Sequence, residues 1–261
     1  MENVGDMKEE RKKELEKFAR QLKEKDLDTL FSRASRLNKL EPVRFPSIPT
    51  IRAYDCAYEA KQSYINGCYR SSIICSSIAT EQSLMHMLIA TSEDWEETYW
   101  QIEIRRMTFG GILKELKRRK YEPLSKFIED ANWLRELRNR VAAHPTYVSA
   151  QAYFERSTRD QIIWENKVMF RDIRKLLNFL SPQKRKEFVE TRKLTGVNSQ
   201  GKVVEERYFR DVLSDPTKID PRTWLDWEGF QSSILGDLAL EAYKRMAKIV
   251  NGLASYIKSH P

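Results

Sequence analysis

The amino-acid sequence predicts an all-α protein: an antiparallel helical bundle with an N-terminal helical arm and a mixed insertion before the last helix. Apolar residues recur at the three- and four-residue spacing of a helix face through most of the chain. Pro42, Pro46 and Pro49 interrupt this pattern, because proline breaks a helix. They separate an arm, residues 1–45, from a helical domain, residues 46–261, whose insertion spans residues 150–228 approximately.

The arm begins with a charged segment of strong helix formers, residues 6–25. Its narrow apolar stripe consists of Leu15, Phe18 and Leu22. This pattern is most typical of a solvated helix that rests on the domain, and it also fits a partner-binding or short coiled-coil arm. A second helix is expected at 27–40, before the prolines.

Two helices joined by a tight turn are expected next. The first is capped by Thr50 and ends at Asn66-Gly67, because glycine readily adopts the backbone conformation that closes a helix. The second runs over residues 69–90. The expected buried side of the first helix is Ile51, Tyr54, Tyr58 and Ile65, and that of the second is Ile74, Ile78, Met85 and Leu88.

A later helix, with Pro123 in its first turn, carries an arginine among apolar residues. Its stripe consists of Phe127, Ala131, Leu134 and Val141, and an advance of about 100° per residue places Arg138 near the middle. Glu81 interrupts the stripe of helix 69–90 in the same way. A buried charge is costly unless paired, so we expect Arg138 and Glu81 to approach each other or to flank a common polar pocket. The pair can also be purely structural, with Arg138 neutralising Glu81.

The end of this helix, LRELRNRVAAHP at residues 134–145, has the side chains that RNA cleavage requires. Attack by the ribose 2′-hydroxyl needs a group that transfers a proton near neutral pH, as histidine does. It also needs a fixed cation for the phosphate oxygens, which arginine binds bidentately. The catalytic candidates are therefore Arg138, Asn139 and His144.

Helix geometry limits how these residues can cooperate. On a continuous helix Arg138 and His144 lie about 120° apart. Either the helix unwinds before Pro145, which disfavours helical backbone at His144, or two copies of the chain share the site. Arg140 lies one turn before His144 and is the second candidate cation.

The segment resembles the motif of HEPN (higher eukaryotes and prokaryotes nucleotide-binding) domains, in which an arginine and a polar residue precede a histidine near a helix end. Here five residues separate Arg138 from His144. Residues 60–87 (AKQSYINGCYRSSIICSSIATEQSLMHM) are similar to the family's preceding helix pair, and the resemblance covers residues 47–147 approximately. It implies a HEPN-like helical bundle that commonly dimerises. Many members cut RNA without metal from a site shared across the dimer, often in bacterial toxin–antitoxin or antiviral defence systems, while others bind nucleotides or act as scaffolds.

A basic segment, residues 105–120, directly precedes the motif helix and contains Glu115 as its single acidic residue. It fits an ordinary solvated surface around a Gly110-Gly111 helix start, and it also fits a track for the RNA backbone. The candidate RNA-binding residues are Arg105, Arg106, Lys117, Arg118, Arg119 and Lys120.

The insertion and the last helix complete the expected fold. Helices are expected at 164–180 and 182–192, followed by a hairpin at 195–207. Trp224 and Trp227 are expected to dock the insertion on the body. The last helix, residues 230–258, should close the bundle through Leu235, Leu238, Ala242, Met246, Ile249 and Leu253.

Composition narrows the function classes. The chain has 261 residues, 46 Lys plus Arg against 38 Asp plus Glu, and 32% charged residues, which favours polyanionic partners such as RNA. Cys56, Cys68 and Cys75 lack a paired spacing, so we expect reduced, partly buried thiols. Neither a zinc-type cluster nor a signal peptide is evident, and no unbroken apolar run reaches the ~18 residues of a membrane span. We therefore expect a cytoplasmic protein without metal, cofactor or membrane partner.

Three functions fit the sequence. The first is a metal-independent HEPN-type endoribonuclease that acts on RNA as a homodimer, with an antitoxin or other regulatory partner possible. The second is a non-catalytic HEPN module that binds RNA or nucleotide, or scaffolds a partner; in that case Arg138 would be held by Glu81 within one subunit. The third is an interaction protein that works through its arm.

Overall fold

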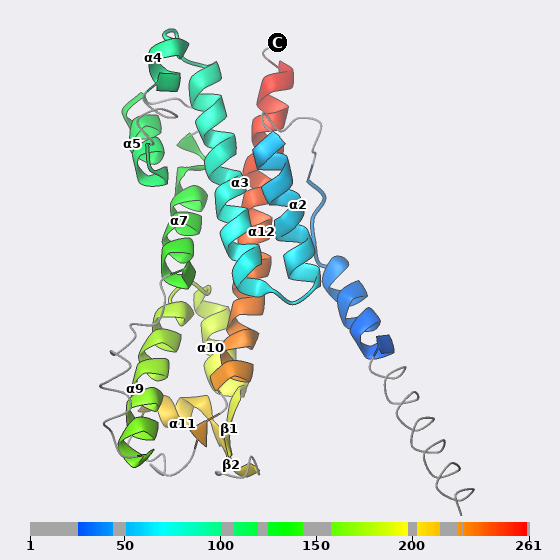
Figure 1. The fold of residues 1–261 in the computed structure, drawn as a ribbon, viewed down its shortest axis with the longest axis vertical. Coiled ribbons are helices and arrows are strands. Elements are labelled where there is room, and N and C mark those ends of the chain that lie inside the picture. Colours follow the sequence, from blue (N-terminus) through cyan, green and yellow to red (C-terminus); the bar gives the residue numbers. More distant parts are fainter. Residues whose placement is uncertain are drawn as a thin grey trace, which may run out of the picture.

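A computed structural model describes the helical body and one helix of the arm (Figure 1). The described residues are 26–43, 51–100, 107–119, 125–142, 158–197, 203–214, 224–225 and 227–259. Their regular structure is predominantly helical, with one small sheet, which confirms the predicted all-α class.

Helix α3 (Tyr69–Ala90) lies at the centre of the bundle and contacts α2 (Ile51–Ile65), α7 (Ile128–Ala142) and α12 (Trp227–Ser259). Three neighbours fit around it because many of its fully buried residues are small, namely Ser72, Ser76, Ser77, Ala79, Thr80 and Ser83, and the distance between packed helices depends on the side chains at the contact. Several of these hydroxyls donate hydrogen bonds to backbone carbonyls. Ser72 Oγ donates to the Ala60 carbonyl of α2 at 2.9 Å, and Ser83 Oγ donates to the Ala79 carbonyl of α3 itself at 2.8 Å. The small buried residues of α3 thus allow α2, α7 and α12 to pack closely around it.

Among the described helices, α3 is also the one whose length and apolar composition would suffice to cross a membrane. It passes that test although serines, a threonine and Glu81 interrupt its apolar residues. More than half of its apolar window is buried inside the protein, which is how the core helix of a bundle behaves.

The predicted buried side of α2 was wrong. Ile51, Tyr54 and Tyr58 are exposed by 81%, 42% and 48%, whereas the buried residues of α2 are Ala53, Ala57, Ala60 and Tyr64. Alanine lets the α2 backbone approach α3 and α12 closely, and bulky side chains would hold the helices apart. Close packing therefore selects the small face of α2, although its other face carries larger apolar residues.

The turn between α2 and α3 forms as predicted at Asn66-Gly67. Gly67 has a φ of +78°, a conformation that glycine adopts without steric cost. The Gly67 amide donates to the Tyr64 carbonyl at 3.0 Å and the Cys68 amide to the Ser63 carbonyl at 2.8 Å. This pair of bonds is a Schellman motif, which satisfies the last carbonyls of α2.

Helix α12 closes the bundle as predicted, and its six predicted core residues are all buried.

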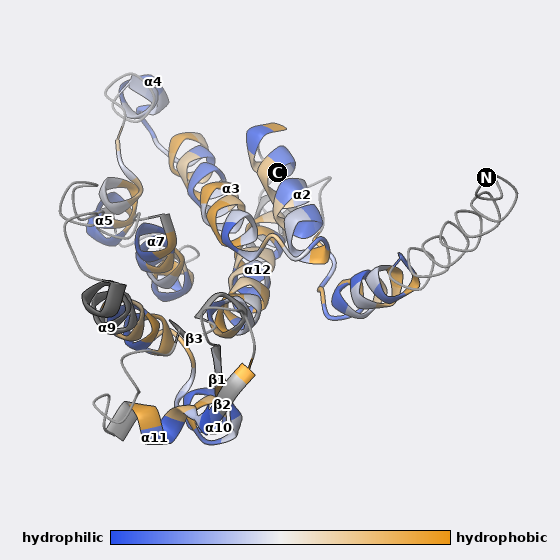
Figure 2. Ribbon diagram, turned by 60° about the horizontal axis from the view of Figure 1, so that its bottom comes forward, coloured by the Kyte–Doolittle hydropathy of each residue, from blue (hydrophilic) through white to orange (hydrophobic). Residues whose placement is uncertain are grey.

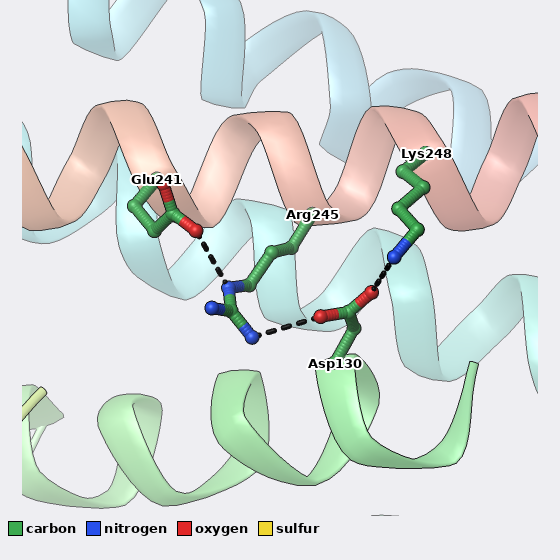
Figure 3. Close-up of polar contacts among 4 residues, drawn as sticks. All are labelled: Asp130, Glu241, Arg245 and Lys248. Atoms are coloured by element: carbon green, nitrogen blue, oxygen red, sulfur yellow. Dashed lines mark hydrogen bonds and ion pairs between the residues drawn. The ribbon is translucent and has the colours of Figure 1, made fainter. Parts of the chain in front are cut away.

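An ionic cluster joins α12 to α7 (Figure 3). Asp130 of α7 accepts a bond from Arg245 Nη1 at 2.8 Å and from Lys248 Nζ at 2.7 Å, while Arg245 Nε donates to Glu241 at 2.9 Å. The guanidinium of Arg245 also covers the ring of Trp133, 4.4 Å from its centroid. This cluster fixes the helix that carries the candidate motif against the closing helix.

The insertion contains the predicted helices and hairpin. Helices α9 (Thr158–Leu177) and α10 (Pro182–Thr191) lead into strands β1 (Lys193–Val197) and β2 (Val203–Tyr208), then α11 (Phe209–Ser214) and β3 (Trp224–Leu225). The strand order is β2-β1-β3, with both pairs antiparallel. Phe230 of α12 packs on Phe188 and Phe209, with ring centroids 5.1 and 4.6 Å apart. Phenylalanines thus dock the insertion on α12; the side chains of Trp224 and Trp227 lie outside the description.

The structure describes residues 26–43 of the arm, of which 26–37 are helical where a helix was predicted at 27–40. This helix projects from the body (Figures 1 and 2). Its C-terminal end is anchored: Arg36 Nε donates to the Ile65 carbonyl at 2.7 Å, and Asn251 Nδ2 donates to the Pro42 carbonyl at 3.0 Å. Val43 is buried at the same end. The predicted helix at 6–25, and the caps at Thr50 and Pro123, lie outside the described residues.

Candidate functional site

The candidate motif lies on α7, whose buried face is the predicted one. Phe127, just before the helix, and Ala131, Leu134, Leu137 and Val141 are all buried. Acidic residues in the first turn, Glu129 and Asp130, favour the helix start electrostatically. At about 100° per residue, Arg138 lies between Ala131 and Leu134 around the helix, so its predicted place within the buried face is confirmed, and Leu137 extends that face beyond Leu134.

Arg138 and Glu81 form an ion pair, which confirms the approach predicted from the two interrupted stripes. Arg138 Nη1 lies 2.5 Å from Glu81 Oε2, and the two side chains are 23% and 17% exposed. The guanidinium also lies over the ring of Phe109, 5.5 Å from its centroid. Phe109 begins α5 (Phe109–Arg119) and is itself buried. Three helices therefore fix one guanidinium, on a side chain that is partly exposed.

The other motif residues lie on a different side of α7. Asn139 and Arg140 are both exposed, as expected for positions about 100° and 200° around the helix from Arg138. His144 lies outside the described residues. The convergence of Arg138 and His144 on one phosphate therefore stays a prediction.

Arg70 is a candidate site residue that the sequence reasoning missed. Arg70 lies in the first turn of α3. Because α3 and α7 run antiparallel (Figure 1), the start of α3 lies beside the C-terminal end of α7. Arg70 Nη1 donates to the Val141 carbonyl at 3.2 Å, and Nη2 donates to Gln231 Oε1 of α12 at 3.1 Å. A cation at a helix C-terminus is favoured by the helix dipole. Arg70 thus holds the last described turn of the motif helix, three residues before His144 in the sequence.

The predicted RNA-binding track is described only in part. Lys117 and Arg118 are exposed on α5, which packs against α7. Arg118 is bound by Glu115 through two hydrogen bonds, of 2.9 and 2.6 Å, so part of its charge is already neutralised. Arg105, Arg106, Lys120 and the side chain of Arg119 lie outside the described residues. Among the candidate RNA-binding residues that the structure describes, Lys117 is exposed and Arg118 is bonded to Glu115.

A polar cavity of about 260 Å³ lies next to the ionic cluster at the other end of α7. Trp133, Lys184, Asp237 and Glu241 are among its lining residues. It lies between the bundle and the start of α10, and it does not include Arg138, Asn139 or Arg140. Among the described residues the motif is therefore a surface site, separate from this cavity.

Among the described residues, the remaining reactive side chains do not form a second centre. Within the described ranges, no group of three His, Cys, Asp or Glu residues could hold a metal ion. Burial raises the pKa of the Cys75 thiol to about 11, and its hydrogen bond to Glu59 acts in the same direction. Burial also raises the pKa of Cys56. All three cysteines are free thiols, as expected, although Cys68 is exposed where partial burial was predicted.

Comparisons with known proteins do not extend this description: no family model, no curated protein and no solved structure matches the chain.

Proposed function

We propose that this protein is a metal-independent endoribonuclease of the HEPN type that cleaves RNA at a site shared across a homodimer. In the reaction the ribose 2′-oxygen attacks the adjacent phosphorus, the 5′-oxygen leaves, and a 2′,3′-cyclic phosphate and a 5′-hydroxyl remain. The 2′-hydroxyl proton is taken by a base and a proton is given to the leaving oxygen. The proposed setting is a bacterial toxin–antitoxin or antiviral defence system.

The observation that carries the proposal is the oriented guanidinium of Arg138. Its bond to Glu81 uses Nη1, and a guanidinium has five N–H donors in a rigid fork. Among the described residues, no second carboxylate binds it. A guanidinium held in place at a partly exposed position can stabilise phosphate charge without first losing conformational freedom. Asn139 would orient the phosphate or the histidine, and His144 would transfer the proton.

The first test is cleavage by the His144→Ala variant. A positioned acid or base contributes about 10²- to 10⁴-fold, so purified His144→Ala protein should cut total RNA slower by that order, in EDTA as in its absence. Mapping the RNA ends by phosphatase and ligase treatment should show cyclic phosphate only with active protein. His260→Ala, which changes a histidine far from the motif in sequence, is the matched control. Equal cleavage by folded His144→Ala and wild-type protein would refute the assignment.

A second function is favoured by the same ion pair. Glu81 lies within the same chain and neutralises Arg138, which weakens its attraction for phosphate. This arrangement fits a non-catalytic module that binds RNA or nucleotide, or scaffolds a partner. RNA binding by the wild-type protein in a gel-shift assay, with no cleavage under any condition, would support this second function over the first.

A further inference from the structure

The cavity beside the ionic cluster offers binding groups that the fold itself does not use. Its volume is about 260 Å³, and residues of α7, α12 and the start of α10 line it. A cavity of about 150 Å³ already holds benzene, whereas sites for drug-sized ligands usually span about 300 to 1,000 Å³. The cavity therefore has room for one compact molecule.

One side of α12 supplies charged groups of both signs. Asp237, Glu241 and Arg245 follow one another at intervals of four residues and therefore lie on the same side of the helix. Arg245 donates from Nη1 to Asp130 and from Nε to Glu241, and Nη2 forms no hydrogen bond with any residue that the structure describes. Figure 3 shows this third nitrogen on the side of the guanidinium away from Asp130 and Lys248. An oriented guanidinium thus keeps donors for a further acceptor.

Two other charged side chains at the cavity are also unused. Lys184 lies in the first turn of α10 and is exposed, and Asp237 is half-buried on α12. Within the described ranges, neither side chain forms a hydrogen bond or an ion pair. Partial burial removes some of the water that hydrates a carboxylate, and a cation from a ligand would replace that lost interaction.

Two aromatic rings form the apolar wall of the cavity. Trp133 of α7 and Phe179, which follows α9, pack edge to face with their ring centroids 5.9 Å apart. Both side chains are half-buried. Aromatic rings at such a wall provide contact area for the apolar part of a ligand, while a few polar groups fix its orientation.

The charge balance of the cavity indicates the class of ligand. Lys184 and Arg245 contribute two positive charges, and Asp237 and Glu241 contribute two negative charges, so these four sum to zero. A phosphate monoester carries a charge of about −1.5 to −2 at pH 7, and both carboxylates would repel it. A small zwitterion instead finds an opposite charge for each of its own. An α-amino acid is such a zwitterion, and its side chain can contact the aromatic wall.

We propose that this cavity binds a free α-amino acid with an apolar or aromatic side chain. The ammonium group of the ligand pairs with Asp237, and its carboxylate pairs with Lys184 and with Nη2 of Arg245. Its side chain packs against Trp133 and Phe179. The inference goes beyond the proposed function, because the cavity lies apart from the motif on α7.

The experiment is an NMR titration of the full chain with L-phenylalanine and L-leucine, because NMR measures weak binding. A compact ligand in an open cavity should bind with a Kd on the order of 0.1 to 1 mM. Two analogues each lack one charge: L-phenylalaninamide has no carboxylate, and N-acetyl-L-phenylalanine has no ammonium group. Each should bind about 10-fold more weakly than L-phenylalanine, because it loses a hydrogen bond between charged groups.

Two variants assign the charges of the ligand to their partners. Lys184→Gln should weaken L-phenylalanine binding about 10-fold and leave L-phenylalaninamide binding unchanged, because the amide has no carboxylate to bind. Asp237→Asn should weaken L-phenylalanine binding in the same way and leave N-acetyl-L-phenylalanine binding unchanged. Lys186→Gln on the same helix is the matched control and should bind like the wild type. Lys184 and Lys186 are both exposed, so the thermal unfolding of these two variants should match the wild type.

The contrary outcomes are equally specific. The proposal is overturned if neither amino acid binds at about 10 mM, ten times the weakest expected Kd, or if Lys184→Gln binds L-phenylalanine like the wild type. Tighter binding of adenosine monophosphate than of either amino acid would also overturn it, in favour of a nucleotide. None of these measurements uses RNA, so their result is independent of whether the motif on α7 cleaves RNA.

Discussion

At the scale of single residues, the decisive side chain is Arg138, because structure and chemistry make different demands on it. Neutralising Glu81 needs only a positive charge near the carboxylate. Stabilising a phosphate needs the planar fork of a guanidinium, which lysine lacks. One substitution can therefore separate the two roles.

Arg138→Lys should keep the ion pair with Glu81 and lose RNA cleavage. The unfolding free energy should change by less than about 1 kcal/mol, while cleavage falls by about 10-fold or more, because the bidentate phosphate contact is lost. Initial rates and urea unfolding measured on the same preparation provide the comparison. Arg135→Lys on the same helix is the control, since Arg135 bonds the neighbouring Asn132 and Glu136. Full activity in Arg138→Lys would leave Arg138 with the structural role alone.

His86 makes stability depend on pH. Burial lowers the pKa of His86 below its usual value of 6.5, so the unfolded chain binds a proton more readily than the folded protein does. The stability that depends on neutral His86 is therefore fully present above pH 6.5 and is lost as the pH falls from there toward the folded pKa.

His86→Gln should flatten this part of the stability profile. Urea unfolding of both proteins at pH 7.5 and pH 5.5 provides the test, and the other two histidines cancel because both proteins contain them. The wild type should lose more unfolding free energy than the variant between these pH values. An equal loss would show that His86 titrates alike in the folded and unfolded chains.

At the scale of the elements, the packing of α12 against the start of α7 depends on one glycine. A Cβ atom at Gly252 would overlap Cζ of Phe127 and would lie 2.9 Å from its Cε1. Phe127 is 3% exposed and belongs to the core, so its ring has little room to move. The close approach of the two helices therefore requires that position 252 lack a side chain.

Gly252→Ala should lower the unfolding free energy by about 1 to 3 kcal/mol, the usual cost of overpacking a core. This loss would exceed the gain of up to about 1 kcal/mol that alanine brings to a helix interior. Gly110→Ala is the control, because a Cβ there meets Arg135 Nη1 at 3.6 Å, an ordinary contact. Chemical denaturation of the two variants should give changes of opposite sign, and a stabilised Gly252→Ala protein would contradict the close helix approach.

At the scale of the whole molecule, the ionic cluster of Figure 3 fixes the motif helix to the closing helix. Asp130 is 14% exposed and faces two cations of α12. Asp130→Ala should lower the unfolding free energy by about 1 to 3 kcal/mol, because Arg245 and Lys248 both lose this carboxylate and the partly buried Arg245 keeps only Glu241. Asp172→Ala is the control: its partners Arg171 and Lys175 lie on the same helix, so the change should stay within about 0.5 kcal/mol. Equal thermal stability of the two variants would show that the cluster adds nothing.

Several features of the whole molecule could be predicted from the sequence because they depend on local rules. Helical spacing located α3, α7, α10 and α12 to within a few residues, and the Asn66-Gly67 turn followed from glycine's freedom at positive φ. The contact between Arg138 and Glu81 was also predicted. The prediction followed from the free-energy cost of burying either charge without a partner, and this cost does not depend on how the helices pack in detail.

The tertiary structure alone decided which faces meet. The sequence of α2 offers an alanine face and a face with isoleucine and tyrosines, and hydrophobicity favours the wrong one. The neighbouring helices α3 and α12 determine which face of α2 is buried, because they leave room only for small side chains. The bond from Arg70 to Val141 likewise joins residues 71 positions apart, and nothing in the sequence near Arg70 indicates it. Periodicity shows that a helix has sides, but only the neighbours determine which side is buried, because close packing depends on the shapes of both partners.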